Sequence, residues 1–142
     1  LRISDGPIAS DLIPHGRADL ILAVEPMEAL RYVDYLCPDG AVVSSASPFV
    51  NIPNYPNIDD VLAALRKVPR HVLVDTRALA KQAGNARAEN TVMLGAATPF
   101  LPLAPESIRA EVCEAFAAKG EAVVAVNAKA FDLGREAALA KQ

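Results

Sequence analysis

The residues of this 142-residue chain with the clearest capacity for ligand chemistry are polar side chains that follow apolar runs. Glu25 follows ADLILAV, where its carboxylate could bind a ribose hydroxyl or a cation, or could simply favour a helix N-terminus. Small polar residues follow the run AVV in the same way, and their hydroxyl and amide groups could contact a phosphate, although serines also commonly begin loops. These candidates are Ser44, Ser45, Ser47 and Asn51.

No residue spacing in the chain predicts a catalytic centre or a metal site. The seven glycines form neither a G-x-G-x-x-G pattern nor a Walker loop, so no dinucleotide site is expected. Cys37 and Cys113 lie far apart without a CxxC motif, which argues against a metal or an iron–sulfur cluster bound by this chain. A triad of Ser45, His15 and Asp75 can be assembled on paper, but almost any sequence allows that. We therefore assign no catalytic residue.

Composition limits the classes of partner. The formal net charge is -3 and no cluster of Lys or Arg stands out, so nucleic acid is not an expected partner. No apolar run has the length of a membrane span, and no signal peptide is recognisable. We expect a cytoplasmic protein in which both cysteines are reduced.

The order of apolar runs and amphipathic segments predicts an α/β fold. Strands are expected at residues 18–24, 41–45 and 71–75, each followed by a helix, and further helices are expected from residue 85 onward. This order is typical of a Rossmann-like, doubly wound, mostly parallel sheet flanked by helices, with extra C-terminal helices. The carboxyl ends of parallel strands share one edge, so Glu25, the serine cluster and the pair Asp75–Thr76 should meet there.

Glycines and caps mark the expected ends of elements. Asp5 and Gly6 separate two short strand-like pieces and predict a hairpin. The helix after the first strand is expected over residues 26–36, with Gly40 closing the following turn. Gly134 is expected to be a weak point in the last helix.

The segment NARAENTVMLGAATPFLPL begins polar and turns apolar over residues 92–103. A helix that is apolar nearly all round must be buried all round, and three strands are expected to offer too little core for it. We therefore expect part of this run to pack against a larger subunit or a second copy of the chain. The interface candidates are Asn85, Arg87, Asn90, Met93, Leu94 and Phe100.

Three motifs in one order resemble a known family. They are EPMEALR at residues 25–31, GNARAENTVMLG at residues 84–95 and NAKAFDLG at residues 127–134. Together they resemble the gamma-type domain of 2-oxoacid:ferredoxin oxidoreductases, and most closely the branch that acts on indolepyruvate. The resemblance covers nearly the whole chain, but the Gly-rich strand-loop-helix portion that opens the family domain has no counterpart. Residues 1–142 are therefore expected to be a single gamma-type domain lacking its first portion.

The resemblance implies a subunit of a complex that oxidatively decarboxylates a 2-oxoacid, here an aryl pyruvate, to an acyl-CoA. It implies that thiamine diphosphate and the iron–sulfur clusters belong to a larger alpha subunit, that ferredoxin accepts the electrons, and that the isolated chain is inactive. A contribution of this chain to the substrate or coenzyme A site stays open. Two alternatives remain: a free-standing α/β module for a small anionic ligand or nucleotide, and an unstable fragment.

Overall fold

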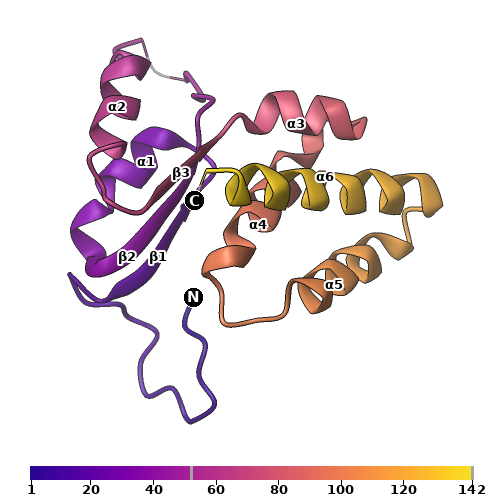
Figure 1. Ribbon diagram of the computed structural model, residues 1–142, viewed down its shortest axis with the longest axis horizontal. Coiled ribbons are helices and arrows are strands. Elements are labelled where there is room, and N and C mark those ends of the chain that lie inside the picture. Colours follow the sequence, from indigo (N-terminus) through magenta and orange to yellow (C-terminus); the bar gives the residue numbers. More distant parts are fainter. Residues whose placement is uncertain (52, 142) are drawn as a thin grey trace.

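A three-stranded parallel sheet organises the computed structural model, which describes residues 1–51 and 53–141. The strands are β1 (Ala18–Ala23), β2 (Leu36–Ser45) and β3 (His71–Val74), and they lie side by side in chain order. Both pairings are parallel. The predicted parallel α/β sheet is confirmed, and the carboxyl ends of all three strands share one edge (Figure 1).

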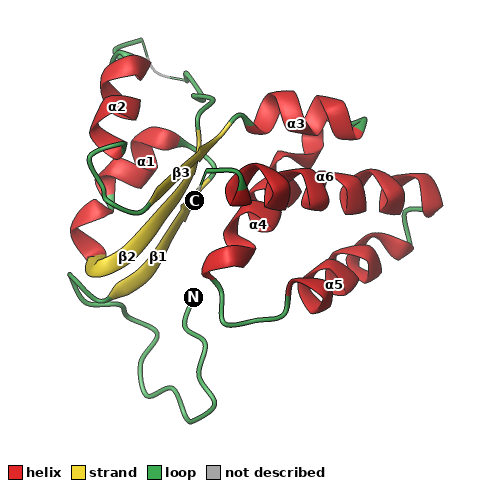
Figure 2. Ribbon diagram, in the orientation of Figure 1, coloured by secondary structure: helices red, strands yellow, loops and turns green. Residues whose placement is uncertain are grey.

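Helices cover both faces of this sheet (Figure 2). The elements are α1 (Pro26–Arg31), η1 (Val33–Tyr35), α2 (Ile58–Leu65), α3 (Thr76–Ala83), η2 (Ala86–Ala88), α4 (Glu89–Ala97), η3 (Thr98–Phe100), α5 (Pro105–Ala117) and α6 (Glu121–Leu139). Val42 and Leu73 pack in one apolar cluster with α1 and α2. Val43, Val72 and Val74 pack in a second cluster with α3, α4 and α6. Because side chains alternate along a strand, the two clusters lie on opposite faces.

Local sequence signals determine several helix ends. Asn57 caps α2, since its Oδ1 accepts a hydrogen bond from the Asp59 amide at 2.8 Å. Gly84 ends α3 with a φ of 115°, which glycine adopts without strain. The helix predicted over residues 26–36 instead ends at Arg31, because the chain tightens into η1 and then enters β2.

β2 is longer than predicted because Gly40 lies inside the strand instead of closing a turn. The pairing with β1 is irregular here: Ala18 pairs with Leu36, whereas Leu20 pairs with Ala41. A Cβ atom on Gly40 would lie 2.6 Å from Leu36 Cδ1 and 2.9 Å from the Ala18 carbonyl oxygen. The missing side chain therefore allows the close packing of this irregular part of the strand.

The apolar run at residues 92–103 is covered largely by the chain itself. Val92 and Met93 on α4 are 0% and 1% exposed, because α4 lies between the sheet and α6. The expectation that the domain has too little core for this part of the run was wrong, since α6 supplies the missing cover. The side chains that follow α4 are less buried, and Leu103 is 45% exposed.

Helices α4 and α6 approach each other backbone to backbone at two glycines. A Cβ atom on Gly95 would overlap the Phe131 carbonyl oxygen, and one on Gly134 would overlap the Val92 carbonyl oxygen. Gly134 is thus a required contact point rather than a weak point of α6. The pair allows α4 to sit deep between α6 and the sheet.

Residues 1–17 contain neither helix nor strand, so the hairpin predicted at Asp5 and Gly6 was wrong. The local turn there is held by the Ser4 hydroxyl, which accepts from the Gly6 amide at 3.0 Å. A two-stranded hairpin needs further packing to be stable in water, and the segment has little. Among the described residues, no strand pairs with the outer edge of β1.

Replacing Gly95 by alanine is expected to lower the free energy of unfolding by about 1–3 kcal/mol, because the added methyl group has no room. Helix propensity alone predicts the opposite sign, a gain of about 1 kcal/mol. Urea unfolding followed by circular dichroism measures the difference. Gly6→Ala is the control and should stay within about 0.5 kcal/mol. A Gly95→Ala chain at least as stable as the wild type would contradict the close crossing.

Candidate functional site

The polar side chains at the ends of β2 and β3 meet at the shared edge, as predicted. Ser45, the buried last residue of β2, places its Oγ 2.9 Å from Oγ1 of Thr76 at the start of α3. The Ser47 hydroxyl donates to Asp75 Oδ1 at 3.2 Å, and the same oxygen accepts from the Ala78 amide at 3.0 Å. These bonds join the loop after β2 to the first turn of α3.

The network continues to α4 through a carboxylate. Thr76 Oγ1 donates to Glu89 Oε2 at 2.6 Å. Because this uses the only hydroxyl proton of Thr76, the single Ser45 proton is shared between Thr76 Oγ1 and the Ser47 carbonyl oxygen, which lies 3.3 Å from Ser45 Oγ. Arg77 places its Nε 4.0 Å from Glu89 Oε1, and its Nη2 donates to the Pro48 carbonyl oxygen at 2.8 Å. The start of α4 is thereby tied to the edge of the sheet.

These bonds change the role of the predicted serine cluster. Ser44 is fully buried and donates to the Ser45 carbonyl oxygen at 3.0 Å, and Ser45 is equally buried. Both hydroxyls are used inside the chain, so the structure offers no support for the phosphate role predicted for these two residues. Ser47 lies at the surface of the edge, and Asn51 is exposed in the following loop.

Glu25 caps α1 and anchors the proline-containing loop between β2 and α2. Its Oε2 accepts from the Glu28 amide at 3.0 Å, which confirms the helix N-terminal role. Its Oε1 accepts a hydrogen bond from the Tyr55 hydroxyl. Burial, this hydrogen bond and the nearby carboxylate charge raise the pKa of Tyr55 to about 12, because each disfavours the phenolate.

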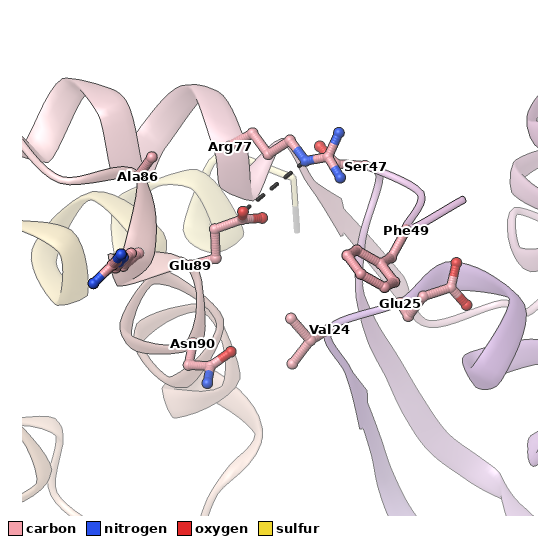
Figure 3. Close-up of a pocket in the computed structure, with 9 residues that line it drawn as sticks. Val24, Glu25, Ser47, Phe49, Arg77, Ala86, Glu89 and Asn90 are labelled. Atoms are coloured by element: carbon pink, nitrogen blue, oxygen red, sulfur yellow. Dashed lines mark ion pairs between the residues drawn. The ribbon is translucent and has the colours of Figure 1, made fainter. Parts of the chain in front are cut away.

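An open groove of about 530 Å³ runs along this edge. Figure 3 shows two unlike walls, with Val24 and Phe49 on the strand side and Glu89 and Asn90 on α4. Val24 is 45% exposed and Phe49 is 63% exposed, so the apolar wall faces solvent. The lining residues are Val24, Glu25, Ser47, Phe49, Arg77, Ala86, Arg87, Glu89 and Asn90.

The groove brings together residues that the sequence placed in separate groups. Glu25 and Ser47 were ligand candidates, whereas Arg87 and Asn90 were interface candidates, and all four line it. Asn85 lies next to the groove, where its Oδ1 caps η2 by accepting from the Arg87 amide at 2.9 Å.

The three apolar interface candidates lie elsewhere. Met93 is buried in the core of the chain, where its side chain contacts other residues of the same chain. Leu94 is partly buried on α4. Phe100 packs against the same core cluster as Met93, with the Arg70 guanidinium 5.8 Å from its ring centroid. The interface candidates that are exposed are therefore the polar ones.

Sequence reasoning did not single out Phe49, Arg77 or Glu89, although all three line the groove. An acidic residue in the first turn of a helix, such as Glu89 on α4, is usually explained by the helix dipole, which hides a second role. The dipole does not explain Arg77 in the first turn of α3, and nothing in the local sequence indicates its contacts. An aromatic residue in a loop was the available signal at Phe49, but the sequence does not show whether such a ring packs inward.

Neither a metal centre nor a membrane span is found among the described residues. No three side chains of His, Cys, Asp or Glu lie together in residues 1–51 and 53–141 so as to hold a metal ion. None of the helices in that part of the chain combines the length and apolarity needed to cross a bilayer.

Thr76→Val should lower the free energy of unfolding by about 1–3 kcal/mol, because it leaves Ser45 and Glu89 without their shared partner. Urea unfolding measures this loss. Thr76→Ser keeps the hydroxyl and should lose less. Equal losses in the two variants would show that the hydroxyl bonds contribute nothing.

Tyr55→Phe should destabilise the chain by about 1 kcal/mol at pH 8, because it removes the hydrogen bond to Glu25. The folded-state pKa of Tyr55 is raised from 10.0 to about 12, so its contribution is complete below pH 10 and is lost as the pH rises toward 12. The gap in urea midpoint between variant and wild type should shrink between pH 8 and pH 11. Tyr32→Phe is the control, since no described residue bonds its hydroxyl. A gap that is constant with pH would contradict the prediction.

Relatives of the chain carry a common name. The protein named indolepyruvate oxidoreductase subunit IorB from Pyrococcus horikoshii is 35% identical over 137 residues, which is 89% of this chain and 66% of the relative. The protein of that name from Thermococcus kodakarensis is 34% identical over 137 residues, with the same coverage. The one from Archaeoglobus fulgidus is 31% identical over 143 residues, which is 94% of this chain and 70% of the relative. The chain thus spans about two thirds of the length of these relatives.

A family model identifies the group to which all these features belong. Residues 1–137 match the model described as pyruvate ferredoxin/flavodoxin oxidoreductase. The match includes all three strands, the Thr76–Glu89 network and the crossing of α4 and α6. The chain therefore belongs to the pyruvate ferredoxin/flavodoxin oxidoreductase family.

Proposed function

We propose that this chain is the gamma-type subunit domain of an oxidoreductase complex that decarboxylates an aryl pyruvate, with indolepyruvate as the first candidate. The complex converts the 2-oxoacid to an acyl-CoA and passes the electrons to ferredoxin. The observation that carries this proposal is the family match over residues 1–137. The shared name of relatives that are 31–35% identical supports the choice of 2-oxoacid.

The residues of this chain do not fit an iron–sulfur cluster. Such clusters are held by about four cysteine thiolates, whereas this chain has Cys37 at the start of β2 and Cys113 on α5. We therefore assign the clusters, and with them thiamine diphosphate, to a larger alpha subunit. This chain then acts by packing against that subunit.

The groove edge is the surface that we assign to this packing. Arg87 and Asn90 are exposed there beside Val24 and Phe49. Interfaces between subunits commonly combine exposed apolar and arginine side chains. The same position would also allow the chain to border the substrate or coenzyme A site of the complex. A free-standing phosphate-binding module has less support, because the hydroxyls of Ser44 and Ser45 are already used inside the chain.

Gentle isolation of the tagged chain from its native cell tests the proposal. We expect a larger chain to co-purify, with thiamine diphosphate and the absorbance of iron–sulfur clusters, and the preparation should reduce ferredoxin with indolepyruvate and coenzyme A. A chain that arrives alone and colourless would overturn the proposal.

Matched charge reversals test the interface. Arg87→Glu should reduce recovery of the larger chain, because it reverses the charge at the groove edge. Arg66→Glu, at the exposed C-terminal end of α2, is the control and should leave recovery unchanged. Equal recovery of the larger chain with both variants would show that the interface does not include the groove edge.

A further inference from the structure

We propose that Phe49 and Val50, on the loop after β2, anchor the chain in an apolar pocket of the larger subunit. This inference rests on the proposed function, because it names the side chains at the groove edge that supply the affinity and the kind of surface that receives them. The observation that carries it is a pair of consecutive large apolar side chains, 63% and 65% exposed, on a loop that hydrogen bonds hold in place.

The start of this loop is held by its polar atoms. The Ser47 amide donates to Ser45 Oγ at 3.0 Å, and the Ser47 hydroxyl donates to Asp75 Oδ1 at 3.2 Å. The Pro48 carbonyl oxygen accepts from Arg77 Nη2 at 2.8 Å, and the proline ring fixes its own φ. An apolar side chain that is already positioned loses less conformational freedom on binding, so more of its burial appears as affinity.

The exposed pair has the character of the centre of an interface. Single exposed apolar residues are normal on a protein surface, but Phe49 and Val50 are consecutive, and Phe49 shares a wall of the groove with Val24 (Figure 3). Aromatic side chains are enriched among the few residues that supply most of the binding energy, whereas the contacts around them mainly exclude water. Phe49 therefore fits the central anchor, and Arg87 and Asn90 fit the polar rim.

The charges on this chain argue against a second copy as the receptor of the anchor. The groove of about 530 Å³ is lined by Glu25 and Glu89 together with Arg77 and Arg87. A second hollow of about 470 Å³, along the carboxyl half of β1, is lined by Glu25 and Glu28. Covering these charges with an aromatic ring would take them out of water, which costs free energy. We therefore assign the apolar pocket to a different chain, the larger subunit.

The Kd of the co-purified complex, measured by its dissociation on dilution, tests the inference. Phe49→Ala should raise this Kd about thirtyfold, as expected when an anchor side chain is truncated. Phe49→Leu keeps most of the apolar volume and should raise the Kd less. Leu139→Ala truncates a 45% exposed side chain at the end of α6, so it is the control and should leave the Kd unchanged. The thermal unfolding midpoint of the isolated Phe49→Ala chain should match that of the wild type, because the ring is mostly exposed.

Salt distinguishes the apolar anchor from the polar rim. Salt screens charges but does not weaken the burial of apolar surface, so the loss of affinity in Phe49→Ala should persist from about 0.1 M to about 1 M sodium chloride. The loss in Arg87→Glu should shrink over the same range. Val50→Asp should weaken the complex at both salt concentrations, because it brings an unpaired carboxylate into an apolar pocket.

The outcomes separate this inference from the proposed function. A complex that forms with the same Kd in the wild type and in Phe49→Ala would overturn the inference alone. A loss in Phe49→Ala that disappears at high salt would also overturn it, because an electrostatic contact would then supply the affinity. A dimer of this chain that requires Phe49 would overturn it in favour of a second copy as the receptor. A wild-type chain without a larger partner would overturn the proposed function, and this inference with it.

Discussion

The backbone contact between α4 and α6 at Gly95 and Gly134 is the constraint on which the candidate site depends. Only glycine at both positions allows α4 to lie deep between α6 and the sheet. At that depth the first turn of α4 reaches the edge where the strands end, and Glu89 comes within hydrogen-bonding distance of Thr76. A larger separation of the two helices would remove one wall of the groove.

The buried hydroxyls of Ser45 and Thr76 fix the position of α4 relative to the carboxyl ends of the strands. Ser45 and Thr76 are both fully buried, so their mutual bond and the bond to Glu89 satisfy groups that would otherwise be costly. The same carboxylate lies beside Arg77, whose guanidinium holds the loop that carries Phe49. The two walls of the groove are therefore connected through one short hydrogen-bond network. A substitution at Thr76 should shift the side chains of both walls.

Because the chain belongs to the pyruvate ferredoxin/flavodoxin oxidoreductase family, the exposed side chains at this edge of the sheet are candidates for contacts within a complex. The chain has a sizeable core of its own, yet two groups of side chains at the edge stay uncovered: the apolar pair Val24 and Phe49, and the polar pair Arg87 and Asn90. A surface that mixes such groups suits both a neighbouring subunit and a small ligand held at the boundary between subunits. These two roles are compatible, because a groove at an interface is closed by the partner.

The sequence by itself determined the elements and their common edge. Apolar runs of strand length and amphipathic segments are local signals, and they predicted all three strands and most helices correctly. The rule that parallel strands end on one side was enough to bring Ser45, Ser47, Asp75 and Thr76 together. Local signals failed at Asp5 and Gly6, where no packing supports the hairpin that their turn chemistry favours.

Only the tertiary structure decided which side chains reach the groove and which are buried. The run at residues 92–103 has the composition of an interface, but α6 covers its first half from within the same chain. Ser44 and Ser47 are equally polar, yet one is buried and the other lies at the surface, because burial depends on what packs across a residue. Residue type and spacing describe what a side chain can do, whereas the partner that it meets comes from segments distant in the sequence.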